Sequence, residues 1–388
     1  MIMSNLEIYI HIPFCEKKCN YCDFVSFRAS YDVIDKYINK LLSEIEAKKY
    51  LANDYNISSI YIGGGTPSFI DSKYITFILE SLRNNYNILD KAEISIEVNP
   101  NSVNKDKIDS YFKSGINRLS IGLQSTNDEE LKTLGRVHNY SDFLNAYNIA
   151  IHSGFKNINI DLINGIPGQS TESYKKSLKQ VLMLNVKHIS IYNLIIEDGT
   201  PFKTMLENNE IQLPLENDIL LMDKITKELT EYYRLKRYEI SNYAKDGYEC
   251  RHNLGYWSDV PYLGFGLNSS SYINDTRYKN KPKLSDYMSL DYRNYMLSDR
   301  QDEYYEEVKP IDKKEHINEY VMLGFRKTEG INVDDFYNTF NQKFADLFDT
   351  ALKIYQGMGM INKKNNNYFL TDKGLNVSNT ILADMLIR

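Results

Sequence analysis

The stretch LEIYIHIPFCEKKCNYC, residues 6–22, joins a β-branched run to a group of three cysteines. Its first part, Leu6–Ile12, is rich in Ile and Tyr and has the length of a β-strand. After the cysteines, Asp32–Leu51 carries apolar residues at three- and four-residue spacing, which is typical of an amphipathic helix. This stretch therefore predicts a strand, a loop with chemical function and a helix, which together form the first unit of a βα repeat.

The same alternation continues to about residue 235. The predicted strands are Leu6–Ile12, Ile57–Ile62, Ala92–Val98, Ile116–Leu123, Lys156–Ile163 and Val186–Leu194. The predicted helices between and after them are Asp32–Leu51, Asp71–Asn85, Lys105–Ser114, Ser141–Ser153, Thr171–Leu184 and Glu216–Leu235. A strand followed by a helix, repeated in this way, predicts right-handed βαβ units and a parallel sheet.

The positions of unusual polar residues favour a barrel over an open sheet. Cysteines follow the first strand, glycines follow the second, Glu97 ends the third, Gln124 follows the fourth and Asp161 lies within the fifth. A curved sheet brings many strand ends to one site at its carboxyl edge, whereas an open sheet concentrates its ligand at one switch point. The sequence therefore predicts an α/β fold with a partial (β/α)6 barrel.

The last third of the chain has a different pattern. A polar, Tyr- and Asp-rich stretch over Asp275–Tyr305 resembles a connector, and an Asn-rich turn over Asn365–Asn367 resembles the tip of a hairpin. The predicted elements after the connector are helices at Lys313–Arg326, Val333–Phe340 and Phe344–Gln356, a hairpin within Gly357–Thr371 and a helix at Lys373–Leu386. We therefore expect two domains, 1–280 and 281–388, the second mostly helical and similar to a winged helix.

The overall composition excludes several classes of protein. The chain has 388 residues, 42% of them hydrophobic and 25% charged, which is ordinary for a globular protein. The net charge of −6 gives no overall basic footprint for nucleic acid. No apolar run is long enough to span a membrane, and the first twelve residues lack the features of a secretory leader. We therefore expect a cytoplasmic protein that does not bind nucleic acid.

Three of the four cysteines, Cys15, Cys19 and Cys22, lie close together. Three thiolates can hold three irons of a 4Fe–4S cluster and leave the fourth iron open to a small molecule. One alternative is a zinc site, for which His11 within the first strand would be an awkward fourth ligand. Another is a redox C-x-x-C pair, which leaves one cysteine without a role. The position after a strand favours the iron–sulfur cluster.

The segment from Tyr9 to Phe24, YIHIPFCEKKCNYCDF, resembles the signature of the radical S-adenosylmethionine (SAM) superfamily. More narrowly, it is similar to the branch that contains the oxygen-independent coproporphyrinogen III oxidases and the HemW haem chaperones. The resemblance extends over nearly the whole chain. It implies a 4Fe–4S cluster on Cys15, Cys19 and Cys22, whose open iron binds SAM.

The resemblance also implies a set of SAM-binding residues. After the second strand, GGGTP resembles the family loop that binds the methionine amino group, and a plain tight turn is the alternative. The remaining positions match the family pattern in kind and spacing. The residues carried over to SAM are Gly64, Gly65, Thr66, Tyr9, Tyr21, Glu97, Gln124, Arg136 and Asp161.

Two features separate the chaperones from the oxidases within this branch. The oxidases carry a fourth cysteine two residues after the third, where this chain has Phe24, so oxidative decarboxylation is doubtful. The stretch CRHNLGYW, residues 250–257, matches the H-N-x-x-Y motif of the chaperones. The resemblance implies that His252 is a haem ligand, with Arg251 near a propionate. Alternatively, His252 stabilises a turn and Tyr256 packs in a core.

The function implied by these resemblances is that of a haem chaperone. Such a protein would bind a 4Fe–4S cluster, SAM and haem, and would deliver haem to an acceptor, for example a haem-dependent membrane enzyme. The alternative is an oxygen-independent coproporphyrinogen III dehydrogenase. Residues 320–330 also resemble the chaperones, and the acidic stretch Asp302–Glu307 argues against a C-terminal module for nucleic acid. We expect this module to act as a lid or a docking domain. Cys250 is expected to be a buried, inert thiol, with haem ligation as the alternative.

Overall fold

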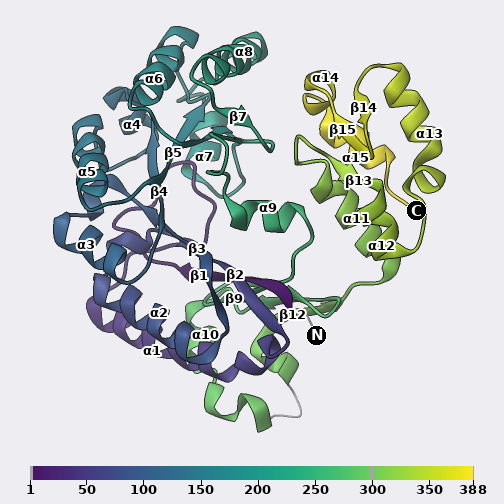
Figure 1. Ribbon diagram of the computed structural model, residues 1–388. Helices are drawn as coiled ribbons and strands as arrows, with labels where there is room; N and C mark the ends of the chain where they lie inside the picture. Colours follow the sequence, from purple (N-terminus) through teal and green to yellow (C-terminus); the bar gives the residue numbers. More distant parts are fainter. Residues whose placement is uncertain (1–2, 298–300, 388) are drawn as a thin grey trace.

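The structure, a computed structural model, describes residues 3–297 and 301–387 (Figure 1). Residues 298–300, within the expected connector, and the outermost residues of the two expected domains lie outside this description. Six consecutive parallel strands form the centre of the molecule, close to where the sequence predicts them. They are β1 (Ser4–Ile12), β2 (Tyr55–Gly64), β3 (Ile88–Val98), β4 (Arg118–Gln124), β5 (Asn157–Asn164) and β6 (His188–Asn193).

Helices connect these strands and follow β6, and most of them lie along the outer side of the sheet (Figure 1). They are α1 (Tyr31–Ala47), α2 (Ser72–Asn85), α3 (Lys105–Lys113), α4 (Asp128–Thr133), α5 (Tyr140–His152), α6 (Thr171–Met183), α7 (Pro201–Glu207) and α8 (Glu216–Tyr232). The six strands keep their chain order within the sheet, with no reversal of direction. A doubly wound sheet would reverse its strand order at a switch point, so the order agrees with the predicted partial barrel.

Strand β1 shows how the sequence separates the core from the site. Its even-numbered residues from Leu6 to Ile12 are completely buried in the main hydrophobic core. Side chains alternate along a strand, so Glu7, Tyr9 and His11 lie together on the opposite face. The apolar half of the pattern thus packs under the helices, while the polar half faces the inside of the curved sheet.

Both edges of the sheet carry strands that the sequence analysis missed. The short strands β8 (Asn242–Ala244) and β7 (Lys236–Arg237) follow β6. On the other edge, β1 pairs with β9, and three antiparallel strands follow it. β9 (Tyr262–Phe265) lies parallel to β1, and the three antiparallel strands are β10 (Ser270–Ile273), β11 (Thr276–Asn280) and β12 (Tyr305–Pro310). The short helix α9 (Arg251–Trp257) lies between the two sets.

The segment expected to be a connector is part of the first core. Helix α10 (Leu284–Ser289) and two 3-10 turns, Tyr292–Leu297 and Gln301–Tyr304, lead into β12. Their tyrosines pack around a buried ion pair at the end of α1, in which Nζ of Lys48, the residue after the helix, lies 2.6 Å from Glu44 Oε1. The first hydrophobic core therefore includes residues up to Tyr305, and the second begins at Ile317, because apolar tyrosine rings hold this polar-looking stretch in the first core.

The second core belongs to the C-terminal domain. Its elements are α11 (Lys313–Gly324), β13 (Ile331–Asn332), α12 (Val333–Phe340), α13 (Phe344–Gly357), β14 (Ile361–Lys364), β15 (Asn367–Leu370), α14 (Asp372–Leu375) and α15 (Ser378–Asp384). Phenylalanines from α12 and α13 dominate the core. The predicted hairpin is confirmed as β14–β15, and the predicted last helix is divided into α14 and α15. Helices with a small sheet agree with the expected winged-helix-like arrangement.

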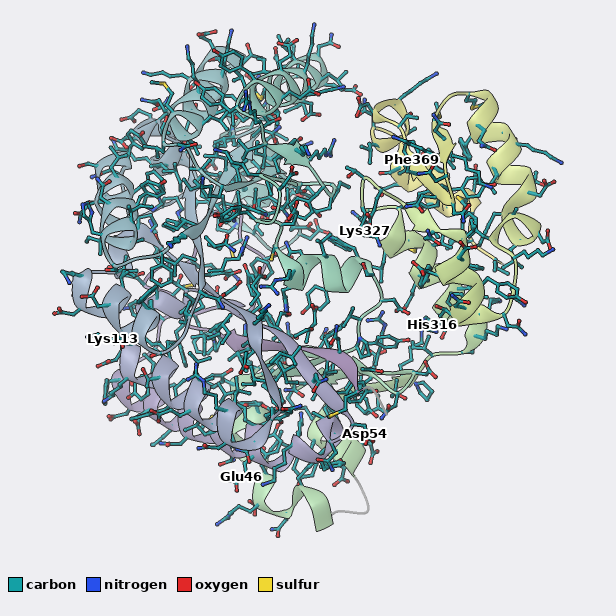
Figure 2. All side chains as sticks on the ribbon, viewed as in Figure 1. Glu46, Asp54, Lys113, His316, Lys327 and Phe369 are labelled. Carbon is teal, nitrogen blue, oxygen red and sulfur yellow. The ribbon has the colours of Figure 1, made fainter. Side chains whose placement is uncertain are left out.

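Helix α11 attaches this domain to the first one. His316 Nε2 lies 2.6 Å from Asp259 Oδ2, just after α9, and Lys327 Nζ donates to Ser258 Oγ at 3.0 Å. Figure 2 labels both His316 and Lys327, which lie on the side of the domain that faces α9. The backbone N–H of Thr328 also donates to the carbonyl of Tyr238 at 3.0 Å. The C-terminal domain thus packs against the helix that carries the H-N-x-x-Y motif.

Candidate functional site

The three clustered cysteines lie in the loop between β1 and α1, at the carboxyl end of the sheet. Cys15 Sγ lies 3.4 Å from Thr66 Oγ1, and Arg136 Nη1 donates to Cys19 Sγ at 3.6 Å. Burial raises the pKa of the Cys15 and Cys22 thiols above the ordinary value. Within residues 3–297 and 301–387, no three His, Cys, Asp or Glu side chains already form a metal-binding group. Metal binding would require the thiols to lose their protons.

The surroundings of the loop fit an iron–sulfur cluster better than zinc. A Cβ atom on Gly65 would stand 2.9 Å from Cys15 Sγ, so glycine leaves space beside that sulfur. His11, the fourth ligand that zinc would need, has both ring nitrogens engaged. Its Nδ1 lies 3.1 Å from Tyr9 Oη, and its Nε2 lies 3.1 Å from the carbonyl of Val25. The loop thus offers three sulfur donors, while the nitrogens of His11 already have other partners. Three sulfur donors suit a 4Fe–4S cluster in which one iron has no protein ligand.

The glycine loop after β2 and the end of β3 form a second part of the site. The N–H of Gly64 donates to Glu97 Oε2 at 3.1 Å, and Tyr61 Oη donates to Glu97 Oε1 at 3.1 Å. Gly64 has φ +119°, and a Cβ there would lie 2.7 Å from His11 Nδ1, so this position requires glycine. Burial and the nearby charge of Asp161 raise the pKa of Glu97 to about 7. Glu97 is therefore a partnered carboxyl group, not a solvated acid at a strand end.

Arg136 connects several strand ends to the cysteine loop. Its Nη2 donates to Asn99 Oδ1 at 3.0 Å and to the carbonyl of Gly122 at 2.8 Å, while Nη1 contacts Cys19. Its Nε is buried and has no hydrogen-bond partner among the described residues. The guanidinium thus has a donor left for a ligand at this edge of the sheet.

Three further residues expected to bind SAM have distinct surroundings. Asp161 accepts from Asn159 Nδ2 at 2.7 Å and from Ser120 Oγ at 3.2 Å, which supplies the partners that a buried carboxylate needs. Gln124 ends β4 with φ +71°, an uncommon conformation for a residue with a side chain. Tyr21 packs against a small apolar cluster, and burial raises the pKa of its hydroxyl. Contacts and strand ends thus gather the expected residues at one edge of the sheet.

A cavity of about 620 Å³ lies beside this edge, within the range of ligand pockets. Aromatic rings dominate its wall. Phe24 reaches it from the cysteine loop, Tyr9 and Tyr61 from the sheet, and Tyr256 from α9. Leu323 of α11 completes the wall from the C-terminal domain. The cavity therefore touches both the predicted cluster loop and the predicted haem motif, two regions far apart in the sequence.

His252 lines this cavity, although its side chain is almost completely buried. Its Nδ1 lies 2.7 Å from Ser59 Oγ and its Nε2 lies 3.1 Å from Tyr256 Oη, while its ring stacks on Tyr61 with centroids 5.2 Å apart. Burial and the Arg118 charge lower the pKa of His252 to about 3, so the imidazole is neutral. A neutral imidazole is the form that binds iron. To bind iron through Nε2, His252 would have to give up its hydrogen bond with Tyr256.

The neighbours of His252 in the motif do not reach the cavity. Cys250 is completely buried, its Sγ contacts Glu93 Oε1 at 3.4 Å, and burial raises the pKa of the thiol to about 12. Arg251 is exposed and is not among the residues that line the cavity. The geometry thus agrees with an inert Cys250 and gives no support to Arg251 as a propionate partner.

The sequence analysis missed one wall of the cavity. Tyr262, Tyr272 and Arg277 line it from β9, β10 and β11. The hairpin of β10 and β11 turns at Asn274 and Asp275, which both have positive φ values of +51° and +53°. Two consecutive residues of this type are a recognised signal for a tight hairpin, so the signal for this wall was present in the sequence.

Comparison with known proteins places this site in context. Residues 9–181 match the Radical SAM superfamily, and residues 311–377 match the HemN C-terminal domain. The chain is 32% identical to a "Heme chaperone HemW" of Bacillus subtilis, covering 97% of this chain and 98% of the relative. It is 34% identical to one of Buchnera aphidicola, covering 98% of both.

A solved structure extends the comparison to the fold. The coproporphyrinogen III oxidase HemN of Escherichia coli superimposes with a TM-score of 0.83 at 24% identity, covering 99% of this chain and 90% of that one. This likeness concerns the fold. Within residues 3–297 and 301–387, no helix is long and apolar enough to cross a membrane.

Proposed function

This chain belongs to the HemW family within the radical SAM superfamily, and we propose that it is a haem chaperone. It would bind a 4Fe–4S cluster, SAM and haem, and would pass the haem to an acceptor protein. Near full-length relatives named as haem chaperones support this function over the dehydrogenase. The observation that carries it is the aromatic cavity between the cysteine loop and His252.

The residues at the sheet edge would hold the cluster and SAM. We propose Cys15, Cys19 and Cys22 as ligands of three irons. Gly64, Gly65, Thr66, Tyr9, Tyr21, Glu97, Gln124, Arg136 and Asp161 are the proposed SAM-binding residues. When bound, the cluster and SAM supply the reductive chemistry of the superfamily. The contacts of Arg136 with Cys19 and of Glu97 with Gly64 support a shared site, since they connect the loops that would hold the two groups.

His252 is the proposed axial ligand of the haem iron. Its neutral ring lies at the cavity wall, and the bond from Nδ1 to Ser59 holds the ring in one orientation, as outer contacts do in metal sites. The rings of Tyr61 and Tyr256 would pack against the macrocycle. The wall therefore combines a nitrogen donor with apolar rings, which suits an iron porphyrin.

Phe24 argues against oxidative decarboxylation. Its side chain is 62% exposed and lines the cavity where the oxidases of this branch carry a cysteine. A phenyl ring cannot supply a thiol to a reaction, but it adds apolar surface for a bound macrocycle.

The proposed acceptor is a haem-dependent membrane protein, reached from the cytoplasm. Co-purification with the hemin-loaded chain would identify the acceptor.

The decisive experiment is anaerobic cluster reconstitution followed by hemin titration. Wild type is expected to bind hemin with a histidine-ligated spectrum, and His252→Ala is expected to lose that spectrum while it keeps its iron and sulfide. His188→Ala is the matched control, because His188 is also buried with both ring nitrogens bonded but does not line the cavity. A wild-type protein that keeps its cluster and does not bind hemin would overturn the proposal. Conversion of coproporphyrinogen to protoporphyrinogen would establish the dehydrogenase instead.

A further inference from the structure

An arginine, Arg277 of β11, lies in the described wall of the cavity. Among the described lining residues, Arg277 of β11 is the only Lys or Arg, and it lies among Tyr262, Tyr272 and other aromatic residues. Its guanidinium stands over the ring of Tyr272, 5.1 Å from the centroid. The described wall also contains the carboxyl side chains of Asp23 and Asp259, so Arg277 is the side chain there that could bind an anionic group of a ligand.

The guanidinium is already shared with the C-terminal domain. Arg277 Nε and Nη2 donate to the two carboxylate oxygens of Glu319 on α11, at 3.1 and 2.5 Å, and Nη1 donates to Tyr262 Oη at 3.2 Å. The other two N–H groups of the guanidinium have no partner within the described chain. Both side chains of the pair are accessible, with Arg277 33% and Glu319 29% exposed. If Glu319 lost this ion pair, its carboxylate could therefore turn to solvent and would not remain buried without a partner.

A chain of contacts connects this cation to the proposed haem ligand. Arg277 bonds Tyr262, the rings of Tyr262 and Tyr256 meet edge to face with centroids 4.7 Å apart, and Tyr256 bonds His252. All four residues line the same cavity. A ligand that binds His252 through a metal would thus extend along a wall in which Arg277 is the only described Lys or Arg.

We infer that Arg277 binds a carboxylate of the ligand in this cavity in competition with Glu319, so that loading the cavity loosens α11 from the first domain. This inference rests on the proposed function, since haem carries two propionates. The guanidinium of Arg277 would then interact with two carboxylates, that of Glu319 and that of the ligand. Each carboxylate weakens the interaction of Arg277 with the other. Cargo binding and release of the C-terminal domain are therefore linked, and the linkage is reciprocal.

The test uses full-length protein with its cluster and two probes, hemin and hemin dimethyl ester, which lacks the carboxylates. Arg277→Gln should weaken hemin affinity about tenfold and leave affinity for the ester unchanged. Glu319→Gln should strengthen hemin affinity several-fold and leave the ester unchanged. The matched control is Glu315→Gln on the same helix, whose partner Lys309 lies outside the cavity wall, and it should change neither affinity.

A second measurement reports on the helix itself. Hemin should speed amide hydrogen exchange in α11 of the wild type, the ester should not, and Glu319→Gln should exchange fast without any ligand. If wild type binds hemin and the ester equally well and Glu319→Gln changes neither affinity nor exchange, the inference is wrong while the haem-binding proposal stands. If wild type binds no hemin at all, the proposed function fails first.

Discussion

The Nδ1 atom of His252 lies 2.7 Å from the Oγ atom of Ser59, which connects α9 to the inner face of β2. Ser59 also donates to Glu7 Oε1 at 3.0 Å, so its hydroxyl joins the proposed haem ligand to a carboxyl group on β1. Burial raises the pKa of Glu7 to about 9, which keeps that carboxyl group protonated. A neutral polar network therefore holds the imidazole, and the ring is not free to rotate.

Ser59→Ala tests this support. The variant leaves His252 Nδ1 without its hydrogen bond in a buried site, so the free energy of unfolding should fall by about 1–3 kcal/mol. Hemin affinity should fall several-fold, because the ring loses its fixed orientation. Ser58→Ala is the control, since Ser58 bonds the carbonyl of Leu6 instead. Urea unfolding and hemin titration measure the two effects, and an unchanged hemin affinity would show that the hydrogen bond does not orient the ligand.

Gly65→Ala tests the space beside the cysteine loop. The new Cβ would stand 2.9 Å from both Cys15 Sγ and the carbonyl oxygen of Phe14, which is closer than atoms pack. Iron and sulfide content after reconstitution should therefore fall well below that of wild type. Gly357→Ala is the control, because its Cβ would meet nothing within 4 Å. Full iron loading of the Gly65 variant would contradict the prediction.

Phe24→Ala tests the apolar wall. The side chain is 62% exposed in the absence of ligand, so its removal should change the free energy of unfolding by less than about 0.5 kcal/mol. Hemin affinity should fall several-fold to about tenfold, since the ring adds apolar area only to the cavity. Phe77→Ala removes a similarly exposed ring from α2, away from the cavity, and serves as the control. Equal hemin affinities of the two variants would remove Phe24 from the binding wall.

The contact between His316 and Asp259 predicts a pH dependence of domain attachment. The hydrogen bond to Asp259 raises the pKa of His316, and Asp275 and Glu319 also favour its charged form. The stabilisation is fully present below the ordinary value of 6.5, and it is lost as the pH rises through the raised pKa. Hydrogen exchange in α11 should thus become faster as the pH rises above 6.5 and through the raised pKa of His316, after correction for intrinsic rates.

His316→Gln should remove most of this pH dependence, because glutamine does not titrate. His152→Gln is the control, since His152 lies exposed on α5 and bonds a carbonyl of its own helix. The same pH series applies to both variants. A slope in the His316 variant equal to that of wild type would show that other groups control the attachment of the C-terminal domain.

Much of the fold could be predicted from local pattern. Strands such as β1 and β5 are runs of β-branched residues between amphipathic helices, and their order of appearance predicted the parallel sheet. The edge strands β9–β12 are short, and Tyr-rich segments such as Tyr292–Tyr305 look polar in a sequence. Their burial depends on partners such as Lys48 and Glu44 that lie more than two hundred residues away, so local pattern does not reveal it.

By itself the sequence determined which chemical groups this protein carries: three cysteines after a strand, a glycine loop, Phe24 in place of a fourth cysteine, and a separate histidine motif. These features follow from residue type and spacing, which a sequence states directly. Only the tertiary structure decided which of them share a cavity. In the folded chain, His252 and Phe24 line the same cavity, Arg251 does not, and Arg277 and Leu323 complete the wall. The sequence does not show this, because residues that line one cavity can lie far apart along the chain.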